Sequence, residues 1–244
     1  DPQQRLFLEE CWKAFEDAGY HFNNLEKEKC GVFVGVTQGD YFSHFKTQEM
    51  DSHILTGTSS SILAARISYY LDLQGPAISI DTACSSSLVA IHQACLSINA
   101  GESELALAGG VYVMTGEQMH IMTSKANMLS EDGKCYAFDH RANGFVPGEA
   151  VGVLVLKSLM KAEADGDHIY GVVKGSGINQ DGKTNGITAP SFKSQARLQR
   201  AVYNKSNVNP NTITYIEAHG TGTMLGDPIE IKALKTSFEQ DLVK

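Results

Sequence analysis

A cysteine at the junction of a predicted strand and a predicted helix is well placed for chemistry. Cys84 follows the apolar run PAISIDTA at 76–83 and opens the run CSSSLVAIHQACLSINAG at 84–101. The unpaired N–H groups and the dipole at a helix start favour the thiolate, which is the nucleophile in covalent catalysis. The same N–H groups can hold a developing oxyanion. Position alone leaves two interpretations open: Cys84 is either a nucleophile or a structural cysteine, as expected for Cys11 and Cys95.

A histidine at the end of another apolar run is the second candidate. His219 follows TITYIEA at 212–218 and precedes the glycine-rich segment GTGT. Ligands of α/β proteins bind at the carboxyl ends of buried strands, and imidazole can exchange protons near neutral pH. Position alone leaves two interpretations open: His219 either acts on a ligand or is a hydrogen-bonded core histidine, which is the more common case for a single histidine. The other seven histidines are expected to pack, cap a helix or face solvent.

Motifs of other enzyme classes are absent from the sequence. The segment HGTGTMLGDP has glycines at 220, 222 and 226, which is not the G-x-G-x-x-G spacing of a dinucleotide-binding loop. The sequence contains neither a G-x-x-x-x-G-K-[ST] loop nor a G-x-S-x-G elbow. The five cysteines, at 11, 30, 84, 95 and 135, have no zinc-binding spacing. We therefore expect no bound metal, and reduced thiols.

Buried strands that alternate with helices must position these residues. Apolar runs rich in Val and Ile predict strands, and apolar residues at helical spacing predict helices. This pattern is typical of a mostly parallel sheet covered on both faces, an α/β fold. The predicted strands lie at 30–36, 76–83, 103–114 and 148–159 and within 169–182 and 212–223, and the predicted helices at 2–18, 62–73, 84–101, 194–206 and 227–240. Asp1 with Pro2 is expected to cap the first helix, and Asp227 with Pro228 the last. Leu88 is expected on the buried face of the helix at 84–101.

Composition and charge exclude several classes of protein. The chain has 244 residues, 42% of them hydrophobic and 20% charged, which is typical of a globular protein. A formal net charge of −8 disfavours nucleic acid or an anionic membrane as the main partner. No apolar run is long enough to span a membrane, and no signal peptide is visible. The first residue is Asp1 rather than Met, so we expect a piece of a longer protein. Because we expect reduced thiols, we expect that protein to be cytoplasmic.

Several of these motifs together resemble one enzyme family. DTACSSSLVAIH around Cys84 and EAHGTGTMLGDPIE around His219 closely resemble the β-ketoacyl synthase (ketosynthase) domain of modular type I polyketide synthases. DPQQR at 1–5, GFVPGEAVGVLVLK at 144–157 and GINQDGKTNGITAPS at 177–191 resemble it too. The segment from 166 to 195 is most similar to ketosynthases whose acyltransferase is supplied in trans. The resemblance implies a thiolase-like α-β-α-β-α sandwich and a homodimer that pairs through the strand at 77–81.

The same resemblance implies a reaction and the residues that carry it. Cys84 would take an acyl chain from an acyl carrier protein, and decarboxylation of malonyl-carrier protein would give the carbon nucleophile. His219 matches the first of two family histidines, which stabilise the enolate. Thr221 and Thr223 match threonines that contact the phosphopantetheine arm of the carrier protein. No cofactor would be bound directly, and no metal is implied.

The chain lacks other parts of the family pattern. A later motif resembling V-K-S-N-I-G-H carries the catalytic lysine and the second histidine of the family, and this sequence contains no such motif. We interpret residues 1–244 as an incomplete ketosynthase domain, with the N-terminal half at about 1–160 and the start of the C-terminal half at about 168–244. We expect this piece to be inactive alone.

Three alternatives remain open at this point. A non-elongating ketosynthase would pass the acyl chain on without decarboxylation. A non-catalytic scaffold would bind carrier protein and dimerise, although it would need neither Cys84 nor His219. A nicotinamide-dependent oxidoreductase is the most distant alternative. The acyl substrate and the product do not follow from the sequence.

Overall fold

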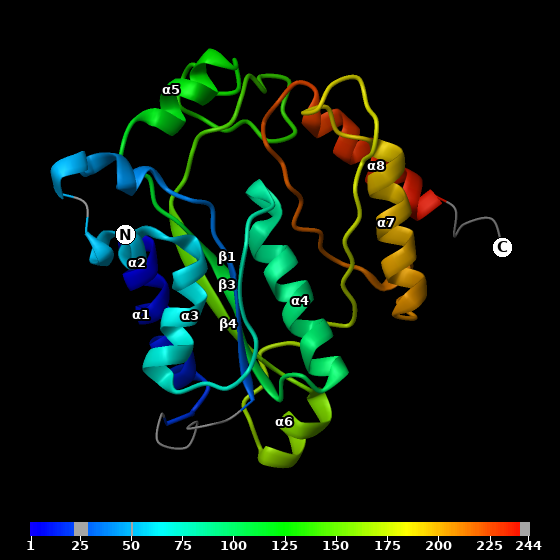
Figure 1. The fold of residues 1–244 in the computed structure, drawn as a ribbon. Coiled ribbons are helices and arrows are strands. Elements are labelled where there is room, and N and C mark those ends of the chain that lie inside the picture. Colours follow the sequence, from blue (N-terminus) through cyan, green and yellow to red (C-terminus); the bar gives the residue numbers. More distant parts are fainter. Residues whose placement is uncertain (22–28, 50, 240–244) are drawn as a thin grey trace. The chain divides into compact units, whose positions relative to one another are not determined.

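Four of the apolar runs form one sheet in the structure, a computed structural model that describes residues 1–21, 29–49 and 51–239 (Figure 1). The chain divides into two units, Asp1–Gln118 with Gly148–Val172 and Met119–Pro147 with Val173–Lys244. Each unit is described by itself. The sheet belongs to the first unit and consists of β1 (Cys30–Gly35), β2 (Ala77–Ile80), β3 (Leu105–Tyr112) and β4 (Ala150–Lys157).

The sheet has the strand order β2-β1-β3-β4. Strand β1 is parallel to both of its neighbours, with Val32 opposite Ala77 on β2 and opposite Leu107 on β3. Strand β4 is antiparallel to β3, with Val155 opposite Leu107. Parallel strands end at the same edge of a sheet, so the segments that follow β1, β2 and β3 meet there.

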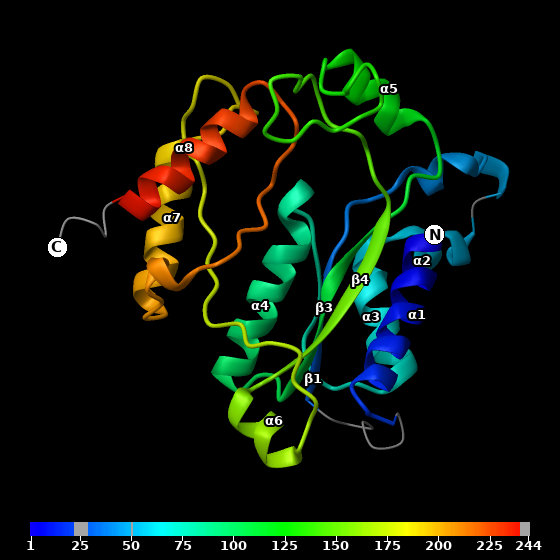
Figure 2. The same ribbon diagram turned by 180° about the vertical axis from the view of Figure 1, so that it is seen from behind.

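Helices cover both faces of this sheet (Figures 1 and 2). Helices α1 (Pro2–Asp17) and α3 (Ser60–Leu71) pack on one face, where Phe7, Ile67 and Val32 belong to a fully buried core. Helix α4 (Ser86–Ala100) packs on the other face through Ala90 and Ala94. Because these side chains are small, α4 lies close to the strands. The remaining elements of the unit are α2 (Ser52–Thr58), α6 (Leu159–Asp165) and the 3-10 turns Asp40–His44, Thr47–Glu49 and Ala83–Ser85.

The second unit is built from helices and extended segments. Helices α7 (Phe192–Lys205) and α8 (Gly226–Glu239) pack side by side (Figures 1 and 2). The Tyr203 and Phe238 rings lie 6.1 Å apart, and the Lys232 ammonium lies 4.1 Å from the Phe192 ring centre. The turn Pro210–Thr212 follows α7, and α5 (Gln118–Lys125) lies where the first unit passes into the second.

Three expectations about local structure are wrong. The described residues contain neither a strand nor a helix within 169–182 or 212–223, apart from the last residue of the turn Pro210–Thr212. A strand needs a hydrogen-bonded neighbour, and in the described part of the chain these runs have none; Tyr215 is 75% exposed. On α4, Leu88 was expected to face the core but is 71% exposed, because Ala90 and Ala94 form the buried face. Of the helix predicted at 227–240, residue 240 lies outside the described residues.

Candidate active site

Cys84 lies in a tight turn between a strand and a helix. The 3-10 turn Ala83–Ser85 follows β2 and leads directly into α4, which begins at Ser86. The Cys84 side chain is exposed, and none of the five cysteines, all within the described ranges, forms a disulfide. The amino end of α4, a helix of 15 residues, carries the positive end of the helix dipole. This is an environment that stabilises a thiolate.

The residue before Cys84 has an unusual backbone conformation. Ala83 has a φ of +56°, in the left-handed region where residues with a Cβ atom are destabilised by about 1–2 kcal/mol. Short polar side chains surround this turn. Ser86 Oγ accepts a hydrogen bond from the Thr82 N–H at 2.8 Å and donates one to the Ala83 carbonyl at 2.6 Å. Ser85 Oγ donates to the Thr82 carbonyl at 2.9 Å, so the serines after Cys84 fold back on the turn.

Two glycines allow the start of α4 to approach the sheet. A Cβ atom at Gly35, the last residue of β1, would lie 2.5 Å from the carbonyl carbon of Ser86. A Cβ atom at Gly110 of β3 would lie 2.8 Å from Ser87 Cβ. Both distances are too short for real atoms, so the absence of these side chains fixes where the helix starts, and with it the position of Cys84.

His219 lies in an extended, exposed segment of the second unit. Its backbone N–H donates to Glu230 Oε1 at 2.7 Å, and the N–H of Gly220 donates to Glu230 Oε2 at 2.9 Å. Glu230 belongs to α8, so one carboxylate of this helix binds two consecutive backbone groups. A helix therefore fixes the backbone of His219 although no strand does.

Thr221 and Thr223 lie in the loop that follows His219. Their hydroxyl oxygens are 2.9 Å apart, and Thr223 Oγ1 accepts a hydrogen bond from the N–H of Gly226 at 3.0 Å. The buried Asp227 accepts from the N–H of Gly222 at 3.1 Å. Gly222 has a φ of +69°, a conformation that glycine adopts without strain.

A second loop packs against this one within the same unit. The Phe138 N–H donates to the other oxygen of Asp227 at 2.6 Å, and the Gly144 N–H donates to the Gly222 carbonyl at 3.0 Å. Asp132 shapes the second loop by accepting hydrogen bonds from three side chains. Those of Asn143, Ser130 and Tyr136, in that order of effect, lower the pKa of Asp132 to about 2.

The structure thus brings three of the four predicted site residues together. His219, Thr221 and Thr223 share one loop in the second unit, whereas Cys84 belongs to the first. Sequence reasoning missed Glu230 and gave Asp227 a different role, as the cap of the last helix. That role is wrong, because α8 begins at Gly226 and the Asp227 carboxylate is turned back to the loop. The two carboxylates of the motif GDPIE at 226–230 were the sequence signal that could have indicated this role in holding the loop.

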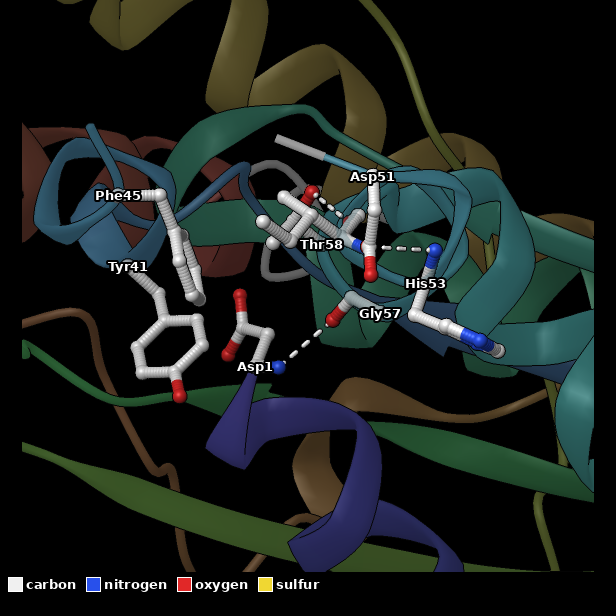
Figure 3. A pocket seen from close by; sticks show the side chains of 8 residues that line it. Asp1, Tyr41, Phe45, Asp51, His53, Gly57 and Thr58 are labelled. Carbon is white, nitrogen blue, oxygen red and sulfur yellow. Dashed lines mark hydrogen bonds between the residues drawn. The ribbon is translucent and has the colours of Figure 1, made fainter. Parts of the chain in front are cut away.

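A pocket elsewhere in the first unit contains none of the predicted site residues. It has a volume of about 490 Å³ and is lined by Tyr41, Phe45 and His53 among others (Figure 3). Asp51 closes one side as the cap of α2, accepting from the N–H groups of His53 and Ile54 at 2.9 Å. We assign it no role.

The described residues hold neither a candidate metal site nor a candidate membrane span. No three His, Cys, Asp or Glu side chains cluster there in a way that could hold a metal ion. No helix in the same ranges is long and apolar enough to cross a membrane.

Comparison with known proteins identifies the family. The model of the N-terminal domain of β-ketoacyl synthases matches residues 1–162, and that of the C-terminal domain matches residues 170–243. The chain belongs to the β-ketoacyl synthase family. It is similar to the polyketide synthase PksL of Bacillus subtilis, with 54% identity over 240 residues, which cover 98% of this chain and 5% of PksL. It is also 50% identical over 240 residues to PksM of that species, covering 98% of this chain and 6% of PksM.

Solved ketosynthase structures share the fold. The ketosynthase from module 6 of the bacillaene synthase of B. subtilis matches with a TM-score of 0.92 and 53% identity, covering 98% of this chain and 41% of that one. The ketosynthase domain OzmH KS7 for oxazolomycin, from Streptomyces albus, matches with a TM-score of 0.91 and 39% identity, and the match covers 98% of this chain and 42% of that one. The expected thiolase-like α/β fold is confirmed. The chain thus spans about two fifths of the similar solved domains and about a twentieth of the similar synthases.

Proposed function

We propose that this chain carries the acyl-loading and condensing residues of a polyketide ketosynthase. The observation that carries the proposal is the exposed Cys84, held in a strained turn at the amino end of a 15-residue helix. A thiolate there is accessible and electrostatically stabilised. The substrates would be acyl and malonyl groups carried as thioesters on the phosphopantetheine arm of acyl carrier protein domains.

In the first proposed step, Cys84 attacks the carbonyl carbon of the acyl thioester. The bond from that carbon to Cys84 Sγ forms, the bond to the phosphopantetheine sulfur breaks, and the departing sulfur takes a proton. The backbone N–H of Cys84, in the turn that leads into α4, supplies one hydrogen bond that stabilises the oxyanion. Thr221 and Thr223 contact the phosphopantetheine arm through their hydroxyl groups.

In the second step, a malonyl thioester loses CO₂ and becomes an enolate. The His219 imidazole donates a hydrogen bond to the thioester oxygen and stabilises the negative charge that develops there. The enolate carbon then attacks the acyl carbon on Cys84, so that a C–C bond forms and the C–S bond to Cys84 breaks. Cys84 leaves as a thiolate, ready for the next acyl group.

The proposal extends to assembly and location. We propose a homodimer that pairs through Ala77–Asp81, in the cytoplasm. Strand β2 lies at the edge of the sheet, and Ile78 on it is 43% exposed. An unpaired strand edge with exposed apolar side chains favours pairing with a second copy.

The test uses the full-length protein with Cys84→Ala and His219→Ala. Cys84→Ala should abolish acyl loading, a loss of at least about 10³-fold, because the nucleophile is gone. His219→Ala should still load the acyl group but form no C–C bond. Intact-protein mass spectrometry after incubation with acyl-carrier protein measures loading, and product analysis measures condensation.

Two outcomes would change the proposal. An acyl group that remains on the Cys84→Ala protein would refute the role of Cys84. Loading without condensation by the unaltered full-length protein would favour the non-elongating alternative, in which only the first step takes place.

A further inference from the structure

The strained residue beside Cys84 is held at both of its backbone groups. The Ala83 N–H donates to Asp81 Oδ1 at 3.0 Å, and the Ala83 carbonyl accepts from Ser86 Oγ at 2.6 Å. Alanine does not favour a φ of +56° by itself. A residue persists in such a conformation only where its surroundings fix it, and these two side chains do so.

The second oxygen of Asp81 is itself held by the neighbouring strand connection. Thr37, two residues after β1, donates from Oγ1 to Asp81 Oδ2 at 2.5 Å. Strands β1 and β2 are parallel neighbours, so the residues that follow them meet at one edge of the sheet. The two oxygens of one carboxylate therefore join the end of β1 to the turn that carries Cys84.

A buried glutamine anchors this chain of contacts in the protein interior. Gln3 of α1 is 2% exposed, and its Nε2 donates to the Thr37 carbonyl at 3.3 Å. Its Oε1 accepts from the N–H of Val113, directly after β3, at 3.1 Å. Gln3 thus connects the ends of β1 and β3. The contacts run from Gln3 through Thr37 and Asp81 to Ala83, all within the first unit.

We propose that Asp81 is a positioning residue for Cys84. It acts through the Ala83 N–H, and its own position is set by Thr37 and the buried Gln3. This inference rests on the proposed role of Cys84 as the nucleophile. The side chain of Asp81 needs no contact with substrate, so its loss should lower the rate of loading and leave KM unchanged.

The Asp81 variants separate its hydrogen bond from its charge. Asp81→Ala removes the acceptor of the Ala83 N–H and should lower kcat for acyl loading about 10- to 100-fold, the range for a lost hydrogen bond to a charged group. Asp81→Asn keeps one acceptor oxygen for that N–H and places its NH₂ group where the other oxygen accepts from Thr37 Oγ1, and this hydroxyl can accept instead of donating. Loading should stay within about threefold of the unaltered rate, since the hydrogen bond to Ala83 is kept.

A second-site change tests the mechanism directly. Glycine adopts a positive φ without strain, so Ala83→Gly should restore a large part of the rate when it is combined with Asp81→Ala. A matched control is Glu102→Ala, which removes an exposed carboxylate just beyond the opposite end of α4. It should change neither kcat nor KM.

The experiment measures acyl loading of the full-length variants by rapid-quench mass spectrometry, with alkylation of Cys84 by iodoacetamide as a readout independent of substrate. Unaltered kcat in Asp81→Ala, equal losses in the Asn and Ala variants, or no rescue by Ala83→Gly would each overturn the inference. If the Asp81→Ala protein fails to fold, the Asp81→Asn protein provides the test, and a fall of its loading rate by more than tenfold would overturn the inference. Loading that persists in Cys84→Ala would instead refute the proposed function itself.

Discussion

At the scale of single residues, carboxylates that bind backbone N–H groups organise the segment around Cys84 in the first unit and the segment around His219 in the second. Asp81 holds the residue before Cys84, and Glu230 holds His219 and Gly220. Hydrogen bonds from N–H groups to an ionised carboxylate are shorter and stronger than those between neutral groups. Such hydrogen bonds can fix the backbone of a loop that is not part of a sheet. The side chains of that loop can then remain accessible.

Loss of Glu230 should therefore affect the chemistry assigned to His219. In Glu230→Ala two backbone N–H groups lose their acceptor, and we expect condensation to fall about 10- to 100-fold. Loading of Cys84 should stay within about threefold, since the hydrogen bonds lost are those from the N–H groups of His219 and Gly220. Glu230→Gln keeps one acceptor oxygen, so its condensation rate should lie between that of the unaltered protein and that of Glu230→Ala. Assays of loading and of C–C bond formation on the same preparations measure the difference.

The control for this prediction lies on the same helix. Glu239→Ala on α8 removes a carboxylate that is 57% exposed and pairs only weakly with Lys235, at 3.5 Å. Exposed pairs contribute about 0–1 kcal/mol, so both activities should be unaffected. An equal fall of loading and condensation in Glu230→Ala would contradict a role specific to His219.

At the scale of elements, the contact of α4 with the strands decides where Cys84 lies. Alanines on the helix and glycines on β1 and β3 allow this close approach. Gly35→Ala would place a methyl group against the Ser86 backbone, which cannot rotate away as a side chain can. Overpacking of this kind costs about 1–3 kcal/mol, and we expect a fall in Tm of about 2–12 °C together with slower loading of Cys84.

A second glycine provides the comparison for this change. Gly57 lies in α2, and an added Cβ atom there would meet no other atom within 4 Å. Alanine is favoured over glycine inside a helix by up to about 1 kcal/mol, so Gly57→Ala should keep or raise the Tm. Differential scanning calorimetry measures the Tm of the Gly35→Ala and Gly57→Ala variants and of the unaltered protein. If the Gly35→Ala protein keeps both its Tm and its rate of loading, α4 can shift without loss of stability or activity, and the prediction is contradicted.

The sequence predicts those elements whose signal is local. Buried runs such as CGVFVGV gave β1, and Asp1 with Pro2 gave the start of α1, where Asp1 Oδ1 accepts from the Gln3 N–H at 2.8 Å. The run TITYIEA has the composition of a strand, but pairing depends on a neighbour that local composition cannot specify. Alanine at a φ of +56° gives no local signal either. The turn at Ala83 therefore emerges only from its contacts.

At the scale of the whole molecule, the sheet has one edge at β2 that the described residues leave unpaired. Strand β2 has only four residues, Ala77–Ile80, and the first two of them are exposed. Short edge strands limit unwanted pairing, whereas exposed apolar residues at such an edge favour a specific partner. A second copy of the chain satisfies both features, because the same edge on each copy can pair about a two-fold axis.

Ile78→Lys on β2 should weaken the proposed dimer. Ile78 is 43% exposed, and two lysines brought together across a two-fold axis would repel each other at an interface that loses its apolar contacts. We expect the dissociation constant of the full-length dimer to rise at least about tenfold, the effect of about 1.4 kcal/mol. Met160→Lys on α6, at a residue that is 80% exposed, is the matched control and should leave assembly unchanged. Analytical ultracentrifugation over a range of concentrations measures both, and a dimer of undiminished affinity in Ile78→Lys would exclude β2 as the interface.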